Sequence, residues 1–410
     1  MSHGAEPDAS LTSVEDYLKV IRTAVRPLVP SVLDLADAEG CVLAEDVTAA
    51  VSLPPFDNSS MDGYAVLSAD VASASQRSPV TLPVTAEVAA GDVGEYWLLP
   101  GTAIKIMTGA RMPAGADAVV PVEWTDGGDV RVSISRVAPS GNAVRYVGGD
   151  ARAGDVLLPV GVRMRPMQIA VAASAGRRAV SVRPRPRVVV LSTGDELSEP
   201  GTPLVPGRIW DSNSYMIAAA ARESGAIAYR RAVVPDDVAG VLPAIEEQTA
   251  RADVLITTGG VSMGGSHDVV KAALAELGTV TFRKVAMQPG MPQGFGVVGP
   301  DAVPIFTLPG NPVSAYVSFQ MFVRPALGFL QGLDDLRLPV VSATLTSPVR
   351  SPAGRRSYLR GVLSGEKVAP LSGQGSHQIA ALGRANALII VPEWETQLPA
   401  GDTVDVVVLP

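Results

Sequence analysis

Three apolar segments that each run into a polar, glycine-containing loop constrain the fold of this chain more than any other feature of its sequence. They are "RVVVL" (residues 187–191), "ADVLIT" (252–257) and "PIFTL" (304–308). Short apolar runs of this kind are typical of strands buried on both faces of a parallel sheet. Helical patterns at residues 214–223 and 238–249 separate the first two. We therefore predict an α/β segment in which strands and helices alternate.

The loops after these strands are expected to form a ligand site. In an open parallel sheet, ligands bind beyond the carboxyl ends of the strands, where such loops meet. The third loop also predicts a helix start, because Asn311 can cap a helix and Pro312 suits its first position. Free backbone amides at such a turn can bind an anion. A tight strand-to-helix turn without a ligand is the alternative for each loop taken alone.

Acidic residues accompany these amides. Asp195 and Glu196 follow the first strand, and Asp268 lies in the second loop. That loop is not a Walker motif, since Ser266 stands where the motif requires lysine. Carboxylates beside amides suit a phosphate ligand that is bound together with Mg²⁺, a cation that prefers oxygen ligands. A turn residue at Asp195 and a helix cap at Asp268 are equally open interpretations.

Size and composition limit the remaining possibilities. A chain of 410 residues is predicted to fold as about two to four domains. Its net charge of −8 argues against nucleic acid and against an anionic membrane surface as partners. The single Cys41 excludes an internal disulfide framework, and no apolar run is long enough to suggest a membrane span. Without a signal-peptide pattern at its start, the chain is expected to be cytoplasmic.

The regions that flank the α/β segment have short apolar runs, prolines and Gly-Asp turns, which predict small β-rich units. Residues 13–26 have the spacing of an amphipathic helix, and Ser13 with Asp16 resembles a capping box. The predicted fold class is multidomain α/β plus β. The predicted domains are 1–52 with 146–184 (a helix and β-rich linker), 53–145 (β-rich), 185–330 (α/β) and 331–410 (a β-barrel).

Two loops of the 53–145 domain are densely polar for segments between strands. They are "PPFDNSSMDGYAV" (54–66) and "KIMTGARMPAGADAVVPVE" (105–123). Asp62 and Thr108 within them can be explained as turn residues. The residues alone favour that interpretation over a functional one.

As a whole, the chain resembles the molybdopterin molybdenumtransferase family, called MoeA in bacteria and the E domain in gephyrin-type proteins. The resemblance spans nearly the whole chain. It rests on the two polar loops above and on five further segments in the same order: "STGDEL", "GRIWDSNSYMI", "TTGGVSMGG", "QPGMPQGFG" and "TLPGNPVSAYVSF".

The resemblance implies an elongated homodimer of four-domain subunits with a MoaB/MogA-like molybdopterin-binding α/β domain. The active site would lie between that domain of one subunit and the "SMDGYA" domain of the other. The implied enzyme is a molybdopterin molybdotransferase. It would insert molybdate into adenylylated molybdopterin, require Mg²⁺, release AMP and give molybdenum cofactor. The resemblance also suggests the molybdopterin adenylyltransferase and molybdoenzyme chaperones as partners.

The loops and the resemblance together give a set of candidate site residues. The implied catalytic residues are Asp62, Thr108, Glu196, Asp236 and Asp268, and the candidate metal ligands are Asp195, Glu196 and Asp268. The expected substrate-binding residues are Ser192, Thr193, Gly194, Gly259, Gly260, Ser262, Gly264, Pro309, Gly310, Asn311, Arg360 and Ser376. Of these, Arg360 and Ser376 are implied to lie near molybdate.

Two departures from the family pattern bear on that site. The family often has Lys-Pro-Gly-Lys-Pro where this chain has "QPGMP", so Gln288 and Met291 replace two lysines that look suited to molybdate. One extra residue also separates Gly264 from Asp268. Three function classes stay open: the molybdenum-inserting enzyme, a pterin-binding scaffold that has lost this activity, and a nucleotidyl-transfer or pyrophosphatase enzyme on the same α/β domain. The flanking domains argue against the third.

Overall fold

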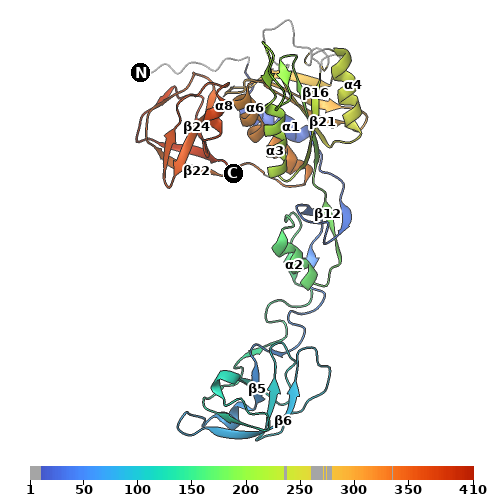
Figure 1. Ribbon diagram of the computed structural model, residues 1–410, viewed down its shortest axis with the longest axis vertical. Coiled ribbons are helices and arrows are strands. Elements are labelled where there is room, and N and C mark those ends of the chain that lie inside the picture. Colours follow the sequence, from blue (N-terminus) through green and yellow to red (C-terminus); the bar gives the residue numbers. More distant parts are fainter. Residues whose placement is uncertain (1–10, 235–237, 260–270, 272–273, 275–278, 335) are drawn as a thin grey trace. The chain divides into compact units, whose positions relative to one another are not determined.

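The protein folds into two compact units (Figure 1). The computed structural model describes residues 11–234, 238–259, 271, 274, 279–334 and 336–410. Unit 1 comprises Met1–Val32, Gly40–Ala44 and Ser181–Pro410, and unit 2 comprises Leu33–Glu39 and Glu45–Val180. Across the described part of the chain, the helices are too short or too polar to cross a membrane.

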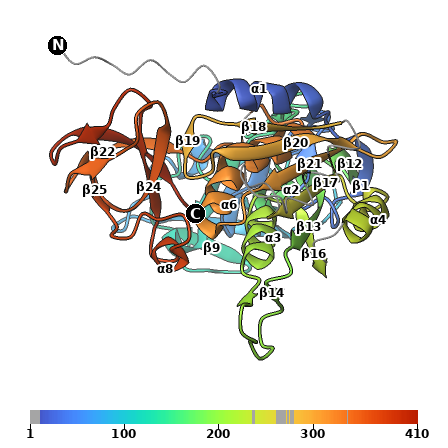
Figure 2. The ribbon, with the colours of Figure 1, turned by 90° about the horizontal axis from the view of Figure 1, so that it is seen from above.

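A six-stranded sheet forms the centre of unit 1 (Figure 2). Its strand order is β16-β13-β17-β21-β20-β18. The first four strands are parallel, β20 is antiparallel to β21, and the outer strand β18 is antiparallel to β20. The bounds are β13 (Arg187–Thr193), β16 (Ile227–Val234), β17 (Val254–Thr258), β18 (Val280–Lys284), β20 (Pro292–Val298) and β21 (Val303–Leu308). The predicted parallel α/β core is confirmed.

Apolar side chains cover both faces of this sheet, as the unbroken apolar runs predict. Along β13, Val188 and Val190 join one core cluster, whereas Val189 and Leu191 join another. The first cluster contains residues of the helical segments on one face, and the second contains residues of α4. The helical segments of the first cluster are α1 (Val14–Ala24), α3 (Asn213–Glu223), α6 (Pro312–Ser318), η3 (Phe319–Val323) and α7 (Arg324–Leu330). The helix of the second cluster, α4, spans Val238–Thr249.

The first helix is capped as predicted but packs elsewhere than expected. The backbone N–H of Asp16 donates to Ser13 Oγ at 3.0 Å. The ring of Tyr17 meets Phe322 edge-on, with 4.8 Å between ring centroids. The buried stripe of α1 thus joins the core of the α/β part, and α1 lies beside β20 (Figure 2). This corrects the expectation that the helix belongs with residues 146–184.

The C-terminal part of unit 1 is a closed barrel, as predicted. Its strands follow one another in the ring β24-β25-β22-β28-β26, and β26 pairs back with β24. The barrel strands are β22 (Val340–Leu345), β24 (Arg356–Ser364), β25 (Lys367–Pro370), β26 (Ala387–Val391) and β28 (Thr403–Val408). The smaller elements of unit 1 are β2 (Val42–Leu43), β14 (Leu197–Ser198), β15 (Ile209–Trp210), β19 (Met287–Gln288), β23 (Val349–Arg350), β27 (Gln397–Leu398) and α8 (Ile379–Leu382).

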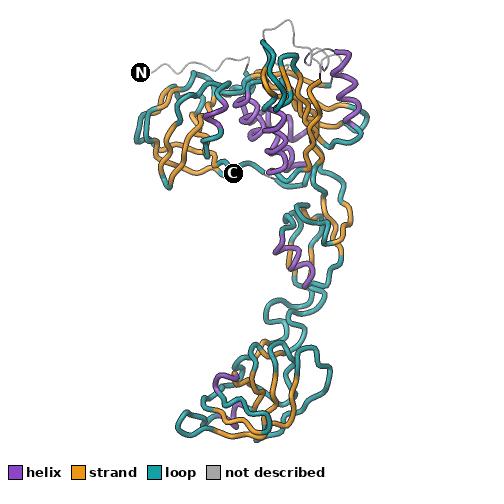
Figure 3. The backbone as a smooth tube through the Cα atoms, in the orientation of Figure 1, coloured by secondary structure: helices purple, strands orange, loops and turns teal. Residues whose placement is uncertain are grey.

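Unit 2 consists mostly of short strands and loops (Figure 3). Its main sheet has the order β8-β5-β7-β6-β9. These strands are β5 (Gly63–Val66), β6 (Val80–Val88), β7 (Ala103–Ile106), β8 (Ala118–Pro121) and β9 (Arg131–Ile134). The remaining elements are β3 (Val47–Thr48), β4 (Asn58–Ser59), β10 (Val144–Arg145), β11 (Val156–Leu158), α2 (Pro166–Ser174), η1 (Ser68–Val71) and η2 (Val122–Trp124). The chain passes between the units within β1 (Ser31–Asp34), around β2 and within β12 (Ala179–Arg183).

Candidate functional site

The three predicted loops begin at one edge of the sheet, and the second is described there only at Gly259. They follow β13, β17 and β21, which are neighbours in the sheet. The N–H of Gly259 donates to the Leu308 carbonyl at 3.1 Å. A Cβ on Gly259, whose φ is +98°, would lie 2.8 Å from the Thr193 carbonyl oxygen, and a Cβ on Gly310 would lie 3.6 Å from Gly259 Cα. Glycine is therefore required where the second loop passes between the other two.

Hydroxyl groups line the strand ends beneath these loops. The buried Ser192 Oγ lies 3.0 Å from Thr258 Oγ1. Thr193 is buried, and its Oγ1 has no hydrogen-bond partner among the described residues. That oxygen lies 3.5 Å from the position of a Cβ on Gly259. A buried hydroxyl without a partner is rare, so this edge has a polar group that a ligand could satisfy.

Two of the three predicted metal ligands lie at this edge. A Cβ on Gly194 would come within 2.6 Å of Glu196 Oε2 and 2.8 Å of Glu196 Oε1. The Glu196 carboxylate therefore folds back over the Gly194 backbone. Asp195 and Glu196 are both exposed. Within the described residues, no group of three or more acidic, His or Cys residues could hold a metal ion.

The predictions also include positions about which the structure is silent. They lie outside the described residues and are Asp236, Gly260, Ser262, Gly264 and Asp268. The third carboxylate of the predicted metal site is among them.

The third loop differs from its prediction in two respects. Asn311 occupies the cap position of α6, but its side chain makes no capping hydrogen bond. The N–H of Val313 donates to the Ser376 carbonyl at 3.1 Å, so this amide is not free to bind an anion. Asn213 of α3 supports the loop instead, since its Nδ2 donates to the Gly310 carbonyl at 2.6 Å. The contact at Val313 joins the sheet edge to the loop that carries Ser376.

Arg360 is buried in this same part of unit 1, with 1% of its surface exposed. Its Nη2 donates to the carbonyl of Gly375 at 3.2 Å and to that of Gly373. Its Nε and Nη1 have no hydrogen-bond partner among the described residues. Burial lowers the pKa of the Arg360 guanidinium. The loop of Ser376 therefore holds one nitrogen of this group, and the other two nitrogens have no acceptor in the described part of the chain.

The segment with the two missing lysines lies against the strand of Arg360. Gln288 of β19 pairs with Ser357 of β24, three residues before Arg360 on that strand. The Met291 carbonyl accepts a hydrogen bond of 2.7 Å from the Val285 N–H. Gln288 and Met291 are both half-buried. The structure thus brings together the barrel strand and the segment where the family often has lysine.

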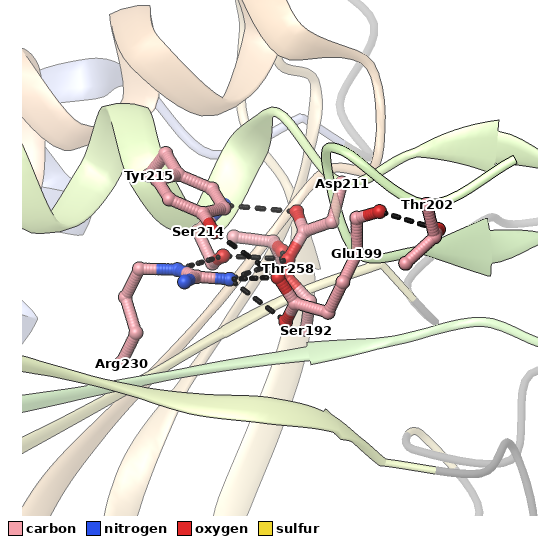
Figure 4. A network of polar contacts seen from close by, with 8 residues as sticks. All are labelled: Ser192, Glu199, Thr202, Asp211, Ser214, Tyr215, Arg230 and Thr258. Carbon is pink, nitrogen blue, oxygen red and sulfur yellow. Dashed lines mark hydrogen bonds and ion pairs between the residues drawn. The ribbon is translucent and has the colours of Figure 1, made fainter.

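A polar network around Arg230 was not predicted (Figure 4). Its Nη2 donates to Glu199 Oε1 at 3.0 Å, and its Nε donates to Ser214 Oγ at 2.7 Å. The guanidinium carbon lies 3.3 Å from the ring centroid of Tyr215, whose hydroxyl donates to Glu199 Oε2 at 3.1 Å. The buried Asp211 accepts from Ser214 Oγ at 2.5 Å.

This network holds the loop of residues 195–211, which begins with the predicted metal ligands Asp195 and Glu196. Residues 195–211 leave the sheet after β13, and β14 pairs with β15 inside them. The N–H of Ile209 donates to the Glu196 carbonyl at 2.7 Å, and Glu199 pairs with Arg230. The three-residue spacing of Asp211 and Ser214 is a local capping pattern that the sequence contains. Glu199 and Arg230 are far apart in the sequence, so no local pattern predicts their ion pair.

In unit 2 the structure joins the two residues of the polar loops. Asp62 Oδ1 accepts from the Thr108 N–H at 2.7 Å and from Thr108 Oγ1 at 2.8 Å. These hydrogen bonds, the backbone bond first, lower the pKa of the Asp62 carboxyl below its usual range. Both residues are exposed. Asp62 is therefore held in one position and charged.

Known families match nearly the whole chain. Residues 12–176 match the family described as "MoeA N-terminal region (domain I and II)". Residues 189–328 match "Probable molybdopterin binding domain", and residues 342–409 match "MoeA C-terminal region (domain IV)".

Named relatives and solved structures agree with these matches. "Molybdopterin molybdenumtransferase 2" of Mycobacterium tuberculosis is 44% identical, over 97% of this chain and 99% of that protein. "Molybdopterin molybdenumtransferase 1" of the same organism is 39% identical, over 96% and 98%. The crystal structure of a "molybdopterin biosynthesis moea protein" from Pyrococcus horikoshii matches with a TM-score of 0.80 and 32% identity, covering 97% of this chain and 99% of that one.

The chain belongs to the molybdopterin molybdenumtransferase (MoeA) family. The expected family is therefore confirmed, and so is the expected class of enzyme, a transferase. Membership also supports the expected role in molybdenum cofactor biosynthesis at that general level.

Proposed function

We propose that this member of the family inserts molybdate into adenylylated molybdopterin, with Mg²⁺-dependent release of AMP, to give molybdenum cofactor. The names of its relatives describe transfer of molybdenum to molybdopterin. Arg360 is the observation that carries the proposal for this chain. It is a buried guanidinium with two nitrogens that have no partner among the described residues.

An oxyanion would satisfy those nitrogens. Removing a charged group from water costs several kcal/mol unless a counter-charge and hydrogen bonds offset it. The planar guanidinium of Arg360 can grip two oxygens of a molybdate ion side by side. The hydroxyl of Ser376 is a further donor, because the loop around it already holds Arg360 Nη2. Arg355, which is half-buried on the same segment, is the second candidate cation.

The sheet edge would hold the phosphates of the adenylylated pterin. Glycines at 194, 259 and 310 let the backbone approach a ligand closely, and Thr193 has an unfilled hydroxyl. The remaining proposed binding positions of this edge are Ser192, Gly260, Ser262, Gly264, Pro309 and Asn311. The hydrogen bond between Val313 and Ser376 joins this edge to the proposed molybdate position.

The carboxylates at the same edge fit a bound Mg²⁺. Asp195 and Glu196 would hold it together with Asp268, because hard oxygen ligands are those that Mg²⁺ prefers. The Glu196 carboxylate already folds over Gly194, where a side chain would displace it. Mg²⁺ would supply positive charge against the negative charge that develops as the phosphate bond breaks.

We further propose that the protein works as a cytoplasmic homodimer in which unit 2 of one subunit completes the site of the other. Asp62 and Thr108 would then act on the substrate together with Glu196, Asp236 and Asp268. The two hydrogen bonds from Thr108 keep Asp62 ionised and oriented for that role. The molybdopterin adenylyltransferase, which would supply the substrate, and molybdoenzyme chaperones are the proposed protein partners.

One assay tests this function directly. The purified protein is incubated with adenylylated molybdopterin, molybdate and Mg²⁺, and AMP and active cofactor are measured. AMP release should require both ions. Rapid AMP release in the absence of any divalent metal would contradict the roles proposed for Asp195, Glu196 and Asp268.

A pterin-binding scaffold without insertion activity is the second candidate. The observation in its favour is that Gln288 and Met291 stand where the family often has lysine, beside the strand of Arg360. A scaffold would bind adenylylated molybdopterin but release no AMP when molybdate is added. The same assay therefore separates the two functions.

A further inference from the structure

A cavity of about 590 Å³ in unit 2 has no part in the proposed function. It is lined by residues 55–57, 94–97 and 111–116, together with Val88 and Val147. Its volume lies within the range of pockets that bind small organic molecules. We call it the unit 2 cavity.

Hydrogen bonds between the lining segments fix the walls of this cavity. The N–H of Met112 donates to the Asp57 carbonyl at 3.0 Å, and that of Ala114 donates to the Tyr96 carbonyl at 2.9 Å. The Tyr96 hydroxyl donates to Asp92 Oδ2 at 2.7 Å. This bond closes the turn that leads into lining residues 94–97. The cavity is therefore preformed, and a ligand would not have to order its walls.

Aromatic residues line this cavity without being fully buried. Trp97 is 71% exposed and Phe56 is 41% exposed, and both line the cavity together with Tyr96. Large aromatic side chains usually bury most of their surface. Rings left open around a cavity provide surfaces on which a planar heterocycle can stack.

The charged groups of the cavity are available as well. Among the residues that the structure describes, neither the Arg111 nor the Glu95 side chain makes a hydrogen bond or ion pair, and both residues are exposed in the lining. Asp57 differs, because its Oδ1 already accepts from the Val147 N–H at 2.7 Å. One guanidinium and one carboxylate thus remain for a ligand that carries both an anionic group and N–H donors.

We propose that the unit 2 cavity binds a planar 2-amino-4-oxopyrimidine ring, as in guanine or a pterin, that carries a phosphate or carboxylate group. The ring would stack on Trp97 and Phe56. Its adjacent ring N–H and amino group would donate to the Glu95 carboxylate, and its anionic group would accept from Arg111. Adenine lacks that pair of adjacent donors and fits less well.

The lining of this cavity includes neither Asp62 nor Thr108, the unit 2 residues already assigned to the reaction. Asp57 and Met112 lie at one end of a short ladder that continues through the bonds of Ser59 with Gly109 and Ala110. Asp62 and Thr108 lie beyond the other end. The cavity residues therefore add a second binding site to unit 2, and the proposal does not depend on the proposed reaction.

Binding to the full-length protein tests the proposal. The fluorescence anisotropy of pterin-6-carboxylate is titrated with protein, and GMP and AMP are then used as competitors. We expect saturable binding, and we expect GMP to compete about tenfold better than AMP, since a paired carboxylate contact of this kind discriminates by roughly that factor. Equal potency of the two nucleotides would overturn the assignment of the ring.

Substitutions in the lining test whether the probe binds in the unit 2 cavity. Arg111→Gln and Trp97→Leu should each weaken binding by about tenfold, and Glu95→Gln should remove the preference for GMP. Arg131→Gln is the matched control, because Arg131 is an exposed arginine of unit 2 outside the cavity. Thermal melting confirms that each variant is folded. Binding that survives both Arg111→Gln and Trp97→Leu, or no binding at about 1 mM protein, would refute the proposal.

Two sources of the ring remain distinguishable within the same experiment. GMP and pterin-6-carboxylate share the recognised ring edge but differ in the ring system and in the anion. The one that binds more tightly identifies the preferred source. Because no molybdate, Mg²⁺ or adenylylated substrate is present, failure of this test leaves the proposed reaction unaffected, and failure of the AMP-release assay leaves this site unaffected.

Discussion

Arg360 in unit 1 and Asp62 in unit 2 hold their charges in opposite ways. Arg360 is buried, two of its nitrogens have no partner among the described residues, and burial disfavours its charged form. Asp62 is exposed, and two hydrogen bonds from Thr108 favour its charged form. The first group keeps two nitrogens without an acceptor among the described residues, whereas the second already receives two hydrogen bonds. We infer that Arg360 serves binding and that Asp62 is already arranged for its task.

The largest effect is expected at Arg360. Arg360→Ala should raise the molybdate concentration for half-maximal AMP release by well over tenfold, because charge-assisted hydrogen bonds contribute roughly 1.5–3 kcal/mol each. Binding of adenylylated molybdopterin should change little. Molybdate titration and direct pterin binding measure the two effects. Unchanged molybdate dependence would show that the oxyanion binds elsewhere.

The stability of an Arg360 variant without molybdate tests whether this buried charge serves binding or folding. Replacing an incompletely paired buried charge with an apolar group of similar volume is often neutral or stabilising. Arg360→Met should therefore unfold at equal or higher denaturant concentration than the original protein without molybdate, although it loses molybdate binding. Marked destabilisation would mean that the contacts to Gly373 and Gly375 make Arg360 a structural residue.

Mixed dimers test whether Asp62 acts across subunits. Asp62→Ala and Asp268→Ala subunits are each expected to be inactive alone. In the proposed homodimer, a hybrid has one intact site, so random exchange of equal amounts should restore about a quarter of the original AMP release. Subunit exchange is verified with differently tagged subunits. Exchange without recovery of activity would contradict a site shared between subunits.

A smaller gain is expected where the lysines are missing. Gln288→Lys combined with Met291→Lys should lower the molybdate concentration for half-maximal AMP release, because two cations would be added beside the strand of Arg360. One charge-assisted hydrogen bond contributes roughly 1.5–3 kcal/mol, so we expect a decrease of about tenfold. The matched control is a substitution of both residues by leucine, which adds no charge. Equal titration curves for the two double variants would separate this segment from molybdate.

The network around Arg230 provides a comparison within unit 1. Arg230→Met removes the partner of the Glu199 carboxylate and should lower the free energy of unfolding by about 1–3 kcal/mol. The neighbouring Arg231→Met removes a more exposed ion pair with Glu247 (2.8 Å) and should cost at most about 1 kcal/mol. Denaturant unfolding of both variants checks the difference. Similar losses of unfolding free energy in the two variants would show that the network around Arg230 stabilises the fold no more than the exposed ion pair of Arg231.

The sequence predicted the elements whose signals are local. The strands β13, β17 and β21, the position of their loops at one edge of the sheet, and the cap at Ser13 all follow from apolar runs, glycines and short-range spacing, whereas the strand order does not. The docking of α1 was missed, because helical spacing indicates which side chains are buried but not against which neighbour.

Contacts between distant residues could not be predicted in this way. Arg230 and Glu199 are 31 residues apart, and no periodic pattern connects them. The resemblance implied that Arg360 lies near molybdate, yet its burial was not foreseeable, since arginine is usually exposed. The free backbone amides expected after Asn311 are also not all free. The Val313 N–H donates to the Ser376 carbonyl, which lies far away in the sequence.

The smallest predicted effect concerns Thr108 and the charge of Asp62. Thr108→Val removes the hydroxyl donor but keeps the backbone N–H, which is the larger cause of the lowered pKa of Asp62. The pKa of that carboxyl should therefore rise only part of the way toward its ordinary value. Carboxyl ¹³C chemical shifts followed against pH measure it, and Thr102→Val is the control, because Thr102 donates to the Leu99 carbonyl and to no carboxylate.

The direction of the pH effect follows from the same hydrogen bonds. A carboxyl whose pKa is lowered by folding stabilises the folded state above its unfolded pKa, and this stabilisation is lost as the pH falls through the folded pKa. Thr108→Val should therefore be slightly less stable than the original protein near neutral pH, and the two should become equal in strong acid. The acid limb of AMP release should move to higher pH in the variant. If the acid limb stays in place although the pKa of Asp62 rises, another group limits the reaction in acid, and Asp62 has a different role from the one proposed here.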